Sequence, residues 1–176
     1  MKFNKPLAGI KLLVLDVDGV MTDGRIIYND LGQEIKCFDV KDGQGIVMLI
    51  KAGVEVLIIS GRKSGVIEPR ARELGIREVY QGIQDKGALC AQILQQKHLK
   101  PEEAVAMGDD VPDLALFEQV GLGIAVADAV PEVLAAAQMM TKKKGGRGAI
   151  REVCEWILKA KHLWPYSDGS SGVSEK

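Results

Sequence analysis

Two aspartates, Asp16 and Asp18, follow the apolar run Leu12–Leu15 and precede Gly19. Residues two apart in an extended chain point the same way, so both carboxylates can face one site. An ionised carboxylate can attack phosphorus, and a second one can protonate the leaving oxygen and later accept a proton from water. Gly19 allows a sharp turn after the pair. Two acids that only cap a strand-to-helix loop would also fit this pattern.

A second acidic group, GDDVPD, follows the apolar residues that end at Met107. Magnesium prefers oxygen ligands and takes only one or two protein carboxylates, so Asp109 could join Asp16 in holding this ion. Acids before Pro112 also favour a helix start. Asp110 and Asp113 therefore either cap that helix or orient the metal ligands.

Phosphate donors follow two further apolar runs. The Ser60 hydroxyl and the Gly61 amide can donate hydrogen bonds to phosphate oxygens, and Lys86 supplies a compact positive charge at a predicted helix start. Alone, each is unremarkable. Together with the acids they form the set that phosphoryl transfer requires: a nucleophile, a bridging cation and donors to the phosphoryl oxygens. The sequence therefore predicts a magnesium-dependent phosphatase that acts on a small phosphate monoester.

Short runs of Val, Ile and Leu alternate with helical patterns, which is typical of a doubly wound, Rossmann-like α/β fold with a mostly parallel sheet. Strands are expected at Lys11–Asp16, Val54–Ser60, Glu78–Tyr80, Ala104–Gly108 and Gly121–Val126. Helices are expected at Gly43–Ala52, Gly65–Leu74, Lys86–His98, Val111–Glu118, Glu132–Ala137 and Ala149–Lys161. Ligands of such sheets bind beyond the carboxyl ends of the strands, where the motifs fall.

The alternation is interrupted at residues 24–40, where two strand-like runs surround the turn Asn29–Gly32. This pattern predicts an inserted β-hairpin and leaves no room for a large cap domain. We expect one domain over residues 1–165 and a disordered tail over residues 166–176.

The 176 residues are 47% hydrophobic and 27% charged, with a formal net charge of -1. A near-neutral chain lacks the positive field that non-specific binding to nucleic acid or an acidic membrane surface needs. The first residues show no signal-peptide pattern, and no apolar run is long enough to span a bilayer. These features predict a cytoplasmic protein that binds neither nucleic acid nor membrane.

The order DxDG, SGR, a lone Lys86 and GDDxxD resembles the haloacid dehalogenase superfamily over nearly the whole domain. The longer strings LDVDGVMTDG, FDVKDGQG, SGRKS, GDDVPD and GGRGAIRE are similar to those of a subfamily in Gram-negative bacteria. That subfamily removes the 8-phosphate of a 3-deoxy eight-carbon sugar acid during lipopolysaccharide biosynthesis. Its members lack a large cap and are homotetramers, in which the hairpins associate and neighbouring subunits help close the site.

The resemblance implies that Asp16 is the nucleophile and Asp18 the acid/base. It implies that Mg²⁺ is held by the carboxylates of Asp16 and Asp109 and the backbone oxygen of Asp18. Ser60 and Lys86 would bind the transferring phosphoryl group. The residues that it implies in substrate binding are Asp18, Asp39, Val40, Lys41, Asp42, Gly43, Gly61, Arg62, Arg70 and Lys86.

Three alternatives remain open from the sequence. A receiver domain of a signalling system also accepts phosphate on an aspartate, although its acceptor follows a later strand. A non-catalytic relative could keep the fold for assembly alone. The substrate could instead be another acidic sugar phosphate, such as a nine-carbon one.

The basic run Lys142–Gly148 is either a solvated loop or a mobile segment that reaches an active site.

Overall fold

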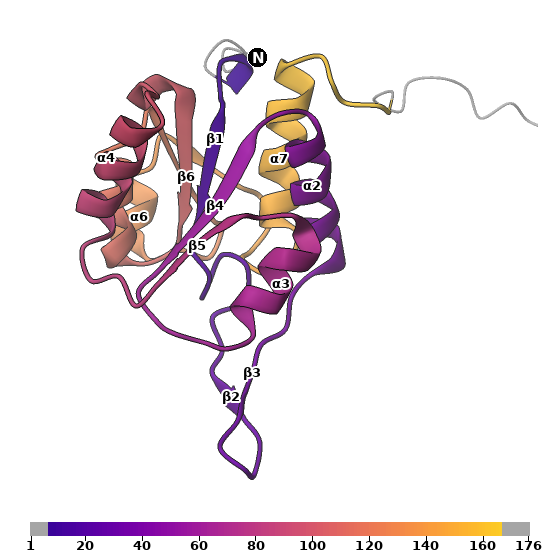
Figure 1. Ribbon diagram of the computed structural model, residues 1–176, viewed down its shortest axis with the longest axis vertical. Helices are drawn as coiled ribbons and strands as arrows, with labels where there is room; N and C mark the ends of the chain where they lie inside the picture. The colour runs from indigo at the N-terminus through magenta and orange to yellow at the C-terminus, as the bar shows by residue number, and fades with distance from the viewer. Residues whose placement is uncertain (1–6, 167–176) are drawn as a thin grey trace, which may run out of the picture.

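The computed structural model describes residues 7–166, and its centre is a six-stranded parallel sheet in the order β5-β4-β1-β6-β7-β8 (Figure 1). The strands are β1 (Leu12–Leu15), β4 (Glu55–Ser60), β5 (Glu78–Gln81), β6 (Ala104–Gly108), β7 (Leu122–Ala125) and β8 (Met139–Met140). The predicted doubly wound fold is confirmed, and each predicted strand is present to within one residue at either end. The edge strand β8 was not predicted, because two residues carry no periodicity.

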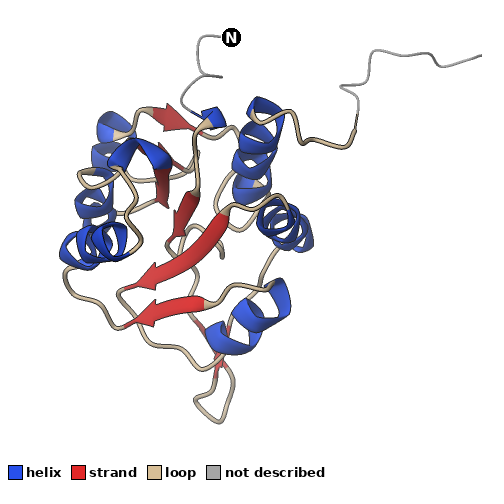
Figure 2. Ribbon diagram, turned by 45° about the horizontal axis from the view of Figure 1, so that its top comes forward, coloured by secondary structure: helices blue, strands red, loops and turns tan. Residues whose placement is uncertain are grey.

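Helices cover both faces of the sheet (Figures 1 and 2). One face carries α2 (Val40–Lys51), α3 (Ile67–Leu74) and α7 (Ala149–Ala160), and the other carries α4 (Lys86–Gln96), α5 (Leu114–Phe117) and α6 (Pro131–Ala136). The single 3-10 turns are η1 (Pro101–Glu103) and η2 (Val111–Asp113). Because both faces are covered, β1 at the centre of the sheet is buried along its whole length.

Four of the predicted helices are present to within two residues at either end, and two differ more. The helix expected over Gly43–Ala52 begins at Val40, because the carboxylate of Asp39 accepts hydrogen bonds from the first-turn amides of Lys41 and Asp42. The segment Asp39–Gly43, which the resemblance implies in substrate binding, is therefore the cap and first turn of α2. The helix expected over Val111–Glu118 is divided into η2 and α5, with Asp110 and Asp113 forming a capping box around η2.

The predicted hairpin is confirmed and consists of β2 (Ile27–Tyr28) and β3 (Glu34–Ile35), paired antiparallel. Its turn is closed by Asn29, whose side-chain oxygen accepts hydrogen bonds from the amides of Leu31 and Gln33. The hairpin projects from the body of the molecule, beyond the carboxyl ends of the strands (Figure 1). The predicted tail beyond Tyr166 lies outside the described residues. Within residues 7–166, no helix is both long and apolar enough to cross a membrane.

Candidate active site

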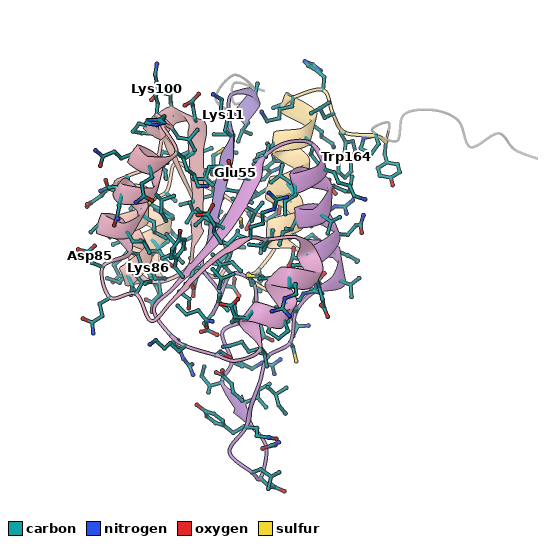
Figure 3. The ribbon with its side chains drawn as sticks, in the orientation of Figure 1. Lys11, Glu55, Asp85, Lys86, Lys100 and Trp164 are labelled. Carbon is teal, nitrogen blue, oxygen red and sulfur yellow. The ribbon has the colours of Figure 1, made fainter. Side chains whose placement is uncertain are left out.

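The strand order of the sheet brings the four sequence motifs together at the carboxyl ends of the strands. Asp16 directly follows β1, and Asp109 directly follows the neighbouring strand β6. Ser60 is the last residue of β4, which pairs with β1 on its other side. Lys86 opens α4, at the end of that helix nearest the carboxyl ends of the strands, whereas Lys100 lies at the opposite end of the molecule (Figure 3).

A buried acidic cluster forms at this edge. Carboxylate oxygens of Asp16, Asp109 and Asp113 lie within 4.8 Å of one another. The ammonium of Lys86 donates to Oδ1 of Asp16 and to Oδ1 of Asp113, at 2.6 Å in both cases. The other oxygen of Asp113 accepts hydrogen bonds from the amides of Asp109 (3.0 Å) and Asp110 (3.3 Å). Asp113 thus orients both Lys86 and the backbone that carries Asp109.

The charges of this cluster are unbalanced, because three carboxylates face one lysine. Burial, and next the neighbouring charge of Asp113, raise the pKa of Asp16 to about 7 despite the Lys86 ammonium. Burial, with the charges of Asp16, Asp113 and Asp110, raises the pKa of Asp109 to about 8. Within the described part of the chain, Oδ1 of Asp109 is buried and has no hydrogen-bond partner. Hard oxygen donors, excess negative charge and an unpaired buried oxygen together fit a divalent cation such as Mg²⁺.

The turn after β1 requires Gly19. Its φ is +96°, and a Cβ atom there would lie 2.0 Å from Oδ2 of Asp109. Any larger residue would therefore displace the carboxylate that the cluster needs. The predicted sharp turn after Asp16 and Asp18 is confirmed, and its close approach to Asp109 explains why glycine stands there.

The side chain of Asp18 faces the hairpin, and not Lys86 of the acidic cluster. Its Oδ1 is paired with the ammonium of Lys36, and its Oδ2 lies 4.0 Å from Nε of Arg62. One oxygen of Glu34 contacts both cations, at 3.3 Å for Lys36 and 2.9 Å for Arg62. We call Asp18, Glu34, Lys36 and Arg62 the hairpin charge network. Glu34 and Lys36 were not predicted from the sequence. The available signal was their spacing of two residues, in and directly after β3, which points both side chains to the same face of an extended segment.

The phosphate-donor segment lies close to the cluster. Ser60 is buried, and its hydroxyl accepts a hydrogen bond from the amide of Arg62 at 3.3 Å. A Cβ atom on Gly61 would lie 4.0 Å from Cε of Lys86, so the backbone of this turn runs alongside the lysine. The structure therefore brings Ser60, Gly61 and Lys86 together as the motif order indicated.

The remaining predicted substrate residues gather at the start of α2. Arg70 of α3 lies against Gly43, and a Cβ atom added to Gly43 would be 2.4 Å from Nη2 of Arg70. The guanidinium carbon of Arg70 also lies over the ring of Phe38, 5.5 Å from the ring centroid. Val40 and Lys41 are exposed. Asp42 is buried and points toward α7, where it accepts hydrogen bonds from two backbone amides. The Asp42 side chain thus connects α2 to the start of α7 by hydrogen bonds. Contact between the substrate and the residues at the start of α2 stays a prediction.

The glycine-rich part of the basic run packs against the turn after β1. A Cβ atom on Gly145 would lie 1.6 Å from the carbonyl oxygen of Gly19, and the amide of Gly146 donates to the carbonyl of Val20 at 2.9 Å. Arg147 pairs with Asp23 at 3.1 Å. A fully solvated loop therefore does not describe Gly145 and Gly146, because their backbone is in direct contact with the active-site turn, whereas the three lysines and Arg147 of the run are exposed.

A doubly wound sheet with DxDG after its central strand and an acidic cluster after the next strand defines a haloacid dehalogenase-like hydrolase, and the family model of that description matches residues 75–153. A 3-deoxy-D-manno-octulosonate 8-phosphate phosphatase, KdsC, of Yersinia pestis is 46% identical over 95% of this chain and 88% of its own length. KdsC of Escherichia coli K12 is 43% identical over 92% and 86%. The chain belongs to this phosphatase family, so a receiver domain is set aside.

Solved structures of relatives have the same fold as this chain. The crystal structure of the Yersinia pestis phosphatase superposes with a TM-score of 0.88 over 91% of this chain and 86% of that one, at 46% identity. A Moraxella catarrhalis phosphatase of the same name, in complex with a magnesium ion, a phosphate ion and a KDO molecule, superposes with a TM-score of 0.89 at 40% identity, covering 92% of both chains.

Proposed function

We propose that this protein hydrolyses 3-deoxy-D-manno-octulosonate 8-phosphate to the free sugar acid (Kdo) and inorganic phosphate, with Mg²⁺ as cofactor. The observation that carries the proposal is the buried cluster of three carboxylates and one lysine, in a chain 46% identical to a phosphatase of that name. The bound magnesium, phosphate and Kdo of the Moraxella catarrhalis relative support the same substrate and cofactor.

In the proposed reaction, a carboxylate oxygen of Asp16 forms a bond to phosphorus while the bond from phosphorus to the sugar oxygen breaks. Asp18 gives its proton to that sugar oxygen. Asp18 then takes a proton from water, whose oxygen attacks the aspartyl-phosphate and releases phosphate and the free Asp16 carboxylate. Ser60 and Lys86 hold the phosphoryl oxygens during both steps.

The magnesium ligands in this proposal are the carboxylates of Asp16 and Asp109 and the backbone oxygen of Asp18. When bound, the ion neutralises negative charge on the phosphoryl oxygens and on the two carboxylates. The sugar acid is bound by residues of the turn after β4, of α3 and of the α2 start. These are Asp39, Val40, Lys41, Asp42, Gly43, Gly61, Arg62 and Arg70.

The proposal includes a cytoplasmic homotetramer that supplies Kdo for lipopolysaccharide in a Gram-negative bacterium. The hairpin supports assembly, because it projects from the body (Figure 1) and exposes a set of large apolar side chains. These are Ile26, Tyr28, Leu31 and Ile35, of which Leu31 is 82% exposed. Apolar groups gathered on a protrusion favour burial against other subunits. Sedimentation of the purified protein would test this part, since a monomer at micromolar concentration contradicts it.

Phosphate release from three substrates tests the reaction: Kdo 8-phosphate, a nine-carbon sugar acid phosphate and neutral glucose 6-phosphate, each with Mg²⁺ and with EDTA. We expect many turnovers per site, dependence on Mg²⁺ and the highest kcat/KM for Kdo 8-phosphate. A higher kcat/KM for the nine-carbon compound would transfer the assignment to that substrate. Equal values for all three would refute recognition of the sugar acid.

A further inference from the structure

A lysine from the hairpin reaches the active-site turn. Lys36 follows β3 directly, and its side chain is only 1% exposed although the hairpin itself projects from the body. Its ammonium is paired with Oδ1 of Asp18 and lies 3.3 Å from Oε1 of Glu34. A buried ammonium is costly unless its charge is paired, and here two carboxylates from different segments pair it.

These contacts distinguish the two oxygens of Asp18. Oδ1 is held by Lys36, whereas Oδ2 lies 4.0 Å from Nε of Arg62, beyond hydrogen-bond distance. An unrestrained aspartate rotates about its terminal bond, which presents either oxygen in a broad range of orientations. Fixing one oxygen therefore sets the direction in which the other one points.

We propose that Lys36 is a positioning residue, which holds Oδ1 of Asp18 so that Oδ2 is the oxygen that meets the leaving group and the attacking water. This inference rests on the proposed function, in which Asp18 transfers the proton. In the first step the proton on Oδ2 passes to the sugar oxygen as its bond to phosphorus breaks. In the second step Oδ2 accepts the proton of the water that attacks the aspartyl-phosphate.

The rest of the hairpin charge network supports this role. Oε1 of Glu34 lies 3.3 Å from the ammonium of Lys36, and Arg62 holds the same Glu34 oxygen at 2.9 Å. The chain of contacts therefore runs from the turn after β4, through the hairpin, to the acid/base. A hairpin displaced from this position would no longer fix the orientation of Asp18.

The test compares two substrates that differ in leaving group and have the same phosphate charge. Phenyl phosphate needs a proton on its departing oxygen, whereas p-nitrophenyl phosphate releases a stable anion without one. For Lys36→Met we expect kcat/KM to fall at least ~10-fold with phenyl phosphate and less than ~3-fold with p-nitrophenyl phosphate, since well-placed general acids contribute ~10²-fold or more. The ratio kcat/KM reports phosphoryl transfer and is insensitive to hydrolysis of the aspartyl-phosphate.

Lys97→Met is the matched control, because Lys97 also bridges two carboxylates, Glu55 and Glu78, and is not among the site residues. We expect it to leave the ratio of the two substrates unchanged. Glu34→Gln, which removes the second partner of Lys36 without altering Asp18, should shift the ratio as Lys36→Met does, by a smaller factor. This variant also serves if Lys36→Met does not fold.

Equal losses on both substrates in Lys36→Met and Glu34→Gln would overturn the inference and leave a purely structural hairpin contact. The wild-type protein separates this result from failure of the proposed function. If the wild type releases no phosphate from Kdo 8-phosphate in the presence of Mg²⁺, the phosphatase assignment fails, and the role of Lys36 fails with it.

Discussion

Replacing Asp109 with asparagine should stabilise the metal-free protein while abolishing its response to magnesium. Asp109 lies in a cluster with the buried Asp16 and Asp113, and burial, followed by the charges of these two neighbours, raises its pKa from the ordinary 3.8 to about 8. Above pH 8 the metal-free protein therefore carries an ionised carboxylate that the folded state disfavours. A neutral amide of similar shape removes this repulsion, and it removes a magnesium ligand.

The size of the effect follows from the pKa. At ~1.36 kcal/mol per pKa unit, the displacement to about 8 corresponds to ~5 kcal/mol of destabilisation when Asp109 is ionised. The amide must find hydrogen-bond partners in the same buried position, which costs ~1–3 kcal/mol. The net gain is then ~2–4 kcal/mol, or roughly 5–10 °C in Tm for a domain of this size.

The sign of the pH dependence is fixed by the raised pKa. The folded state binds the Asp109 proton more tightly than the unfolded chain, so metal-free stability falls as pH rises from about 4 to about 8. At pH 5.5 most of the penalty is absent, and the advantage of Asp109→Asn should shrink to less than about half of its value at pH 8.

Thermal unfolding followed by circular dichroism provides the assay, with EDTA or excess Mg²⁺ at pH 5.5 and pH 8. Magnesium at 100 times its Kd should stabilise the wild type by ~2.7 kcal/mol and leave Asp109→Asn unchanged. Asp110→Asn is the control, because Asp110 is the exposed neighbour that caps η2 and asparagine caps a helix start about as well, so Tm should change little and the magnesium response should remain. A lower Tm for metal-free Asp109→Asn at pH 8, or a retained magnesium response, would refute the reasoning.

Asp16→Asn should abolish phosphate release, because an amide is a poor nucleophile; wild-type-like turnover would exclude the covalent mechanism. Gly145→Ala should lower both Tm and activity, since its Cβ would overlap a carbonyl oxygen of the active-site turn, whereas Gly65→Ala, with no atom within 4 Å, should change neither. Asp42→Ala should destabilise the fold by ~2–4 kcal/mol in urea titrations, because two part-buried amides at the start of α7, those of Gly148 and Arg151, lose their acceptor; a change under ~1 kcal/mol would contradict this role. Arg147→Ala should alter the KM for Kdo 8-phosphate with little change in Tm, because its ion pair is exposed; unchanged kinetic constants would leave the segment a packing role only.

The fold was predictable because its signals are local. Buried parallel strands appear as apolar runs such as Ala104–Gly108, and glycines such as Gly75, with φ +79°, end helices at recognisable positions. Signals weaker than these were misread. Capped by Asp39, α2 begins three residues before the expected start, and the two residues of β8 are too few to show a pattern.

The types of chemical group at the site were determined by the sequence alone. Carboxylates and a hydroxyl at the ends of apolar runs, and a lysine at the start of the helix that follows another run, are expected at the carboxyl ends of a parallel sheet, which is why Asp16, Ser60, Lys86 and Asp109 could be named in advance. Their pairing was decided by the tertiary structure. The orientation of side chains between distant segments has no local signal in the sequence. Three contacts therefore appear only when distant segments pack together: Lys86 pairs with both Asp16 and Asp113, Lys36 of the hairpin pairs with Asp18, and Gly145 contacts the active-site turn.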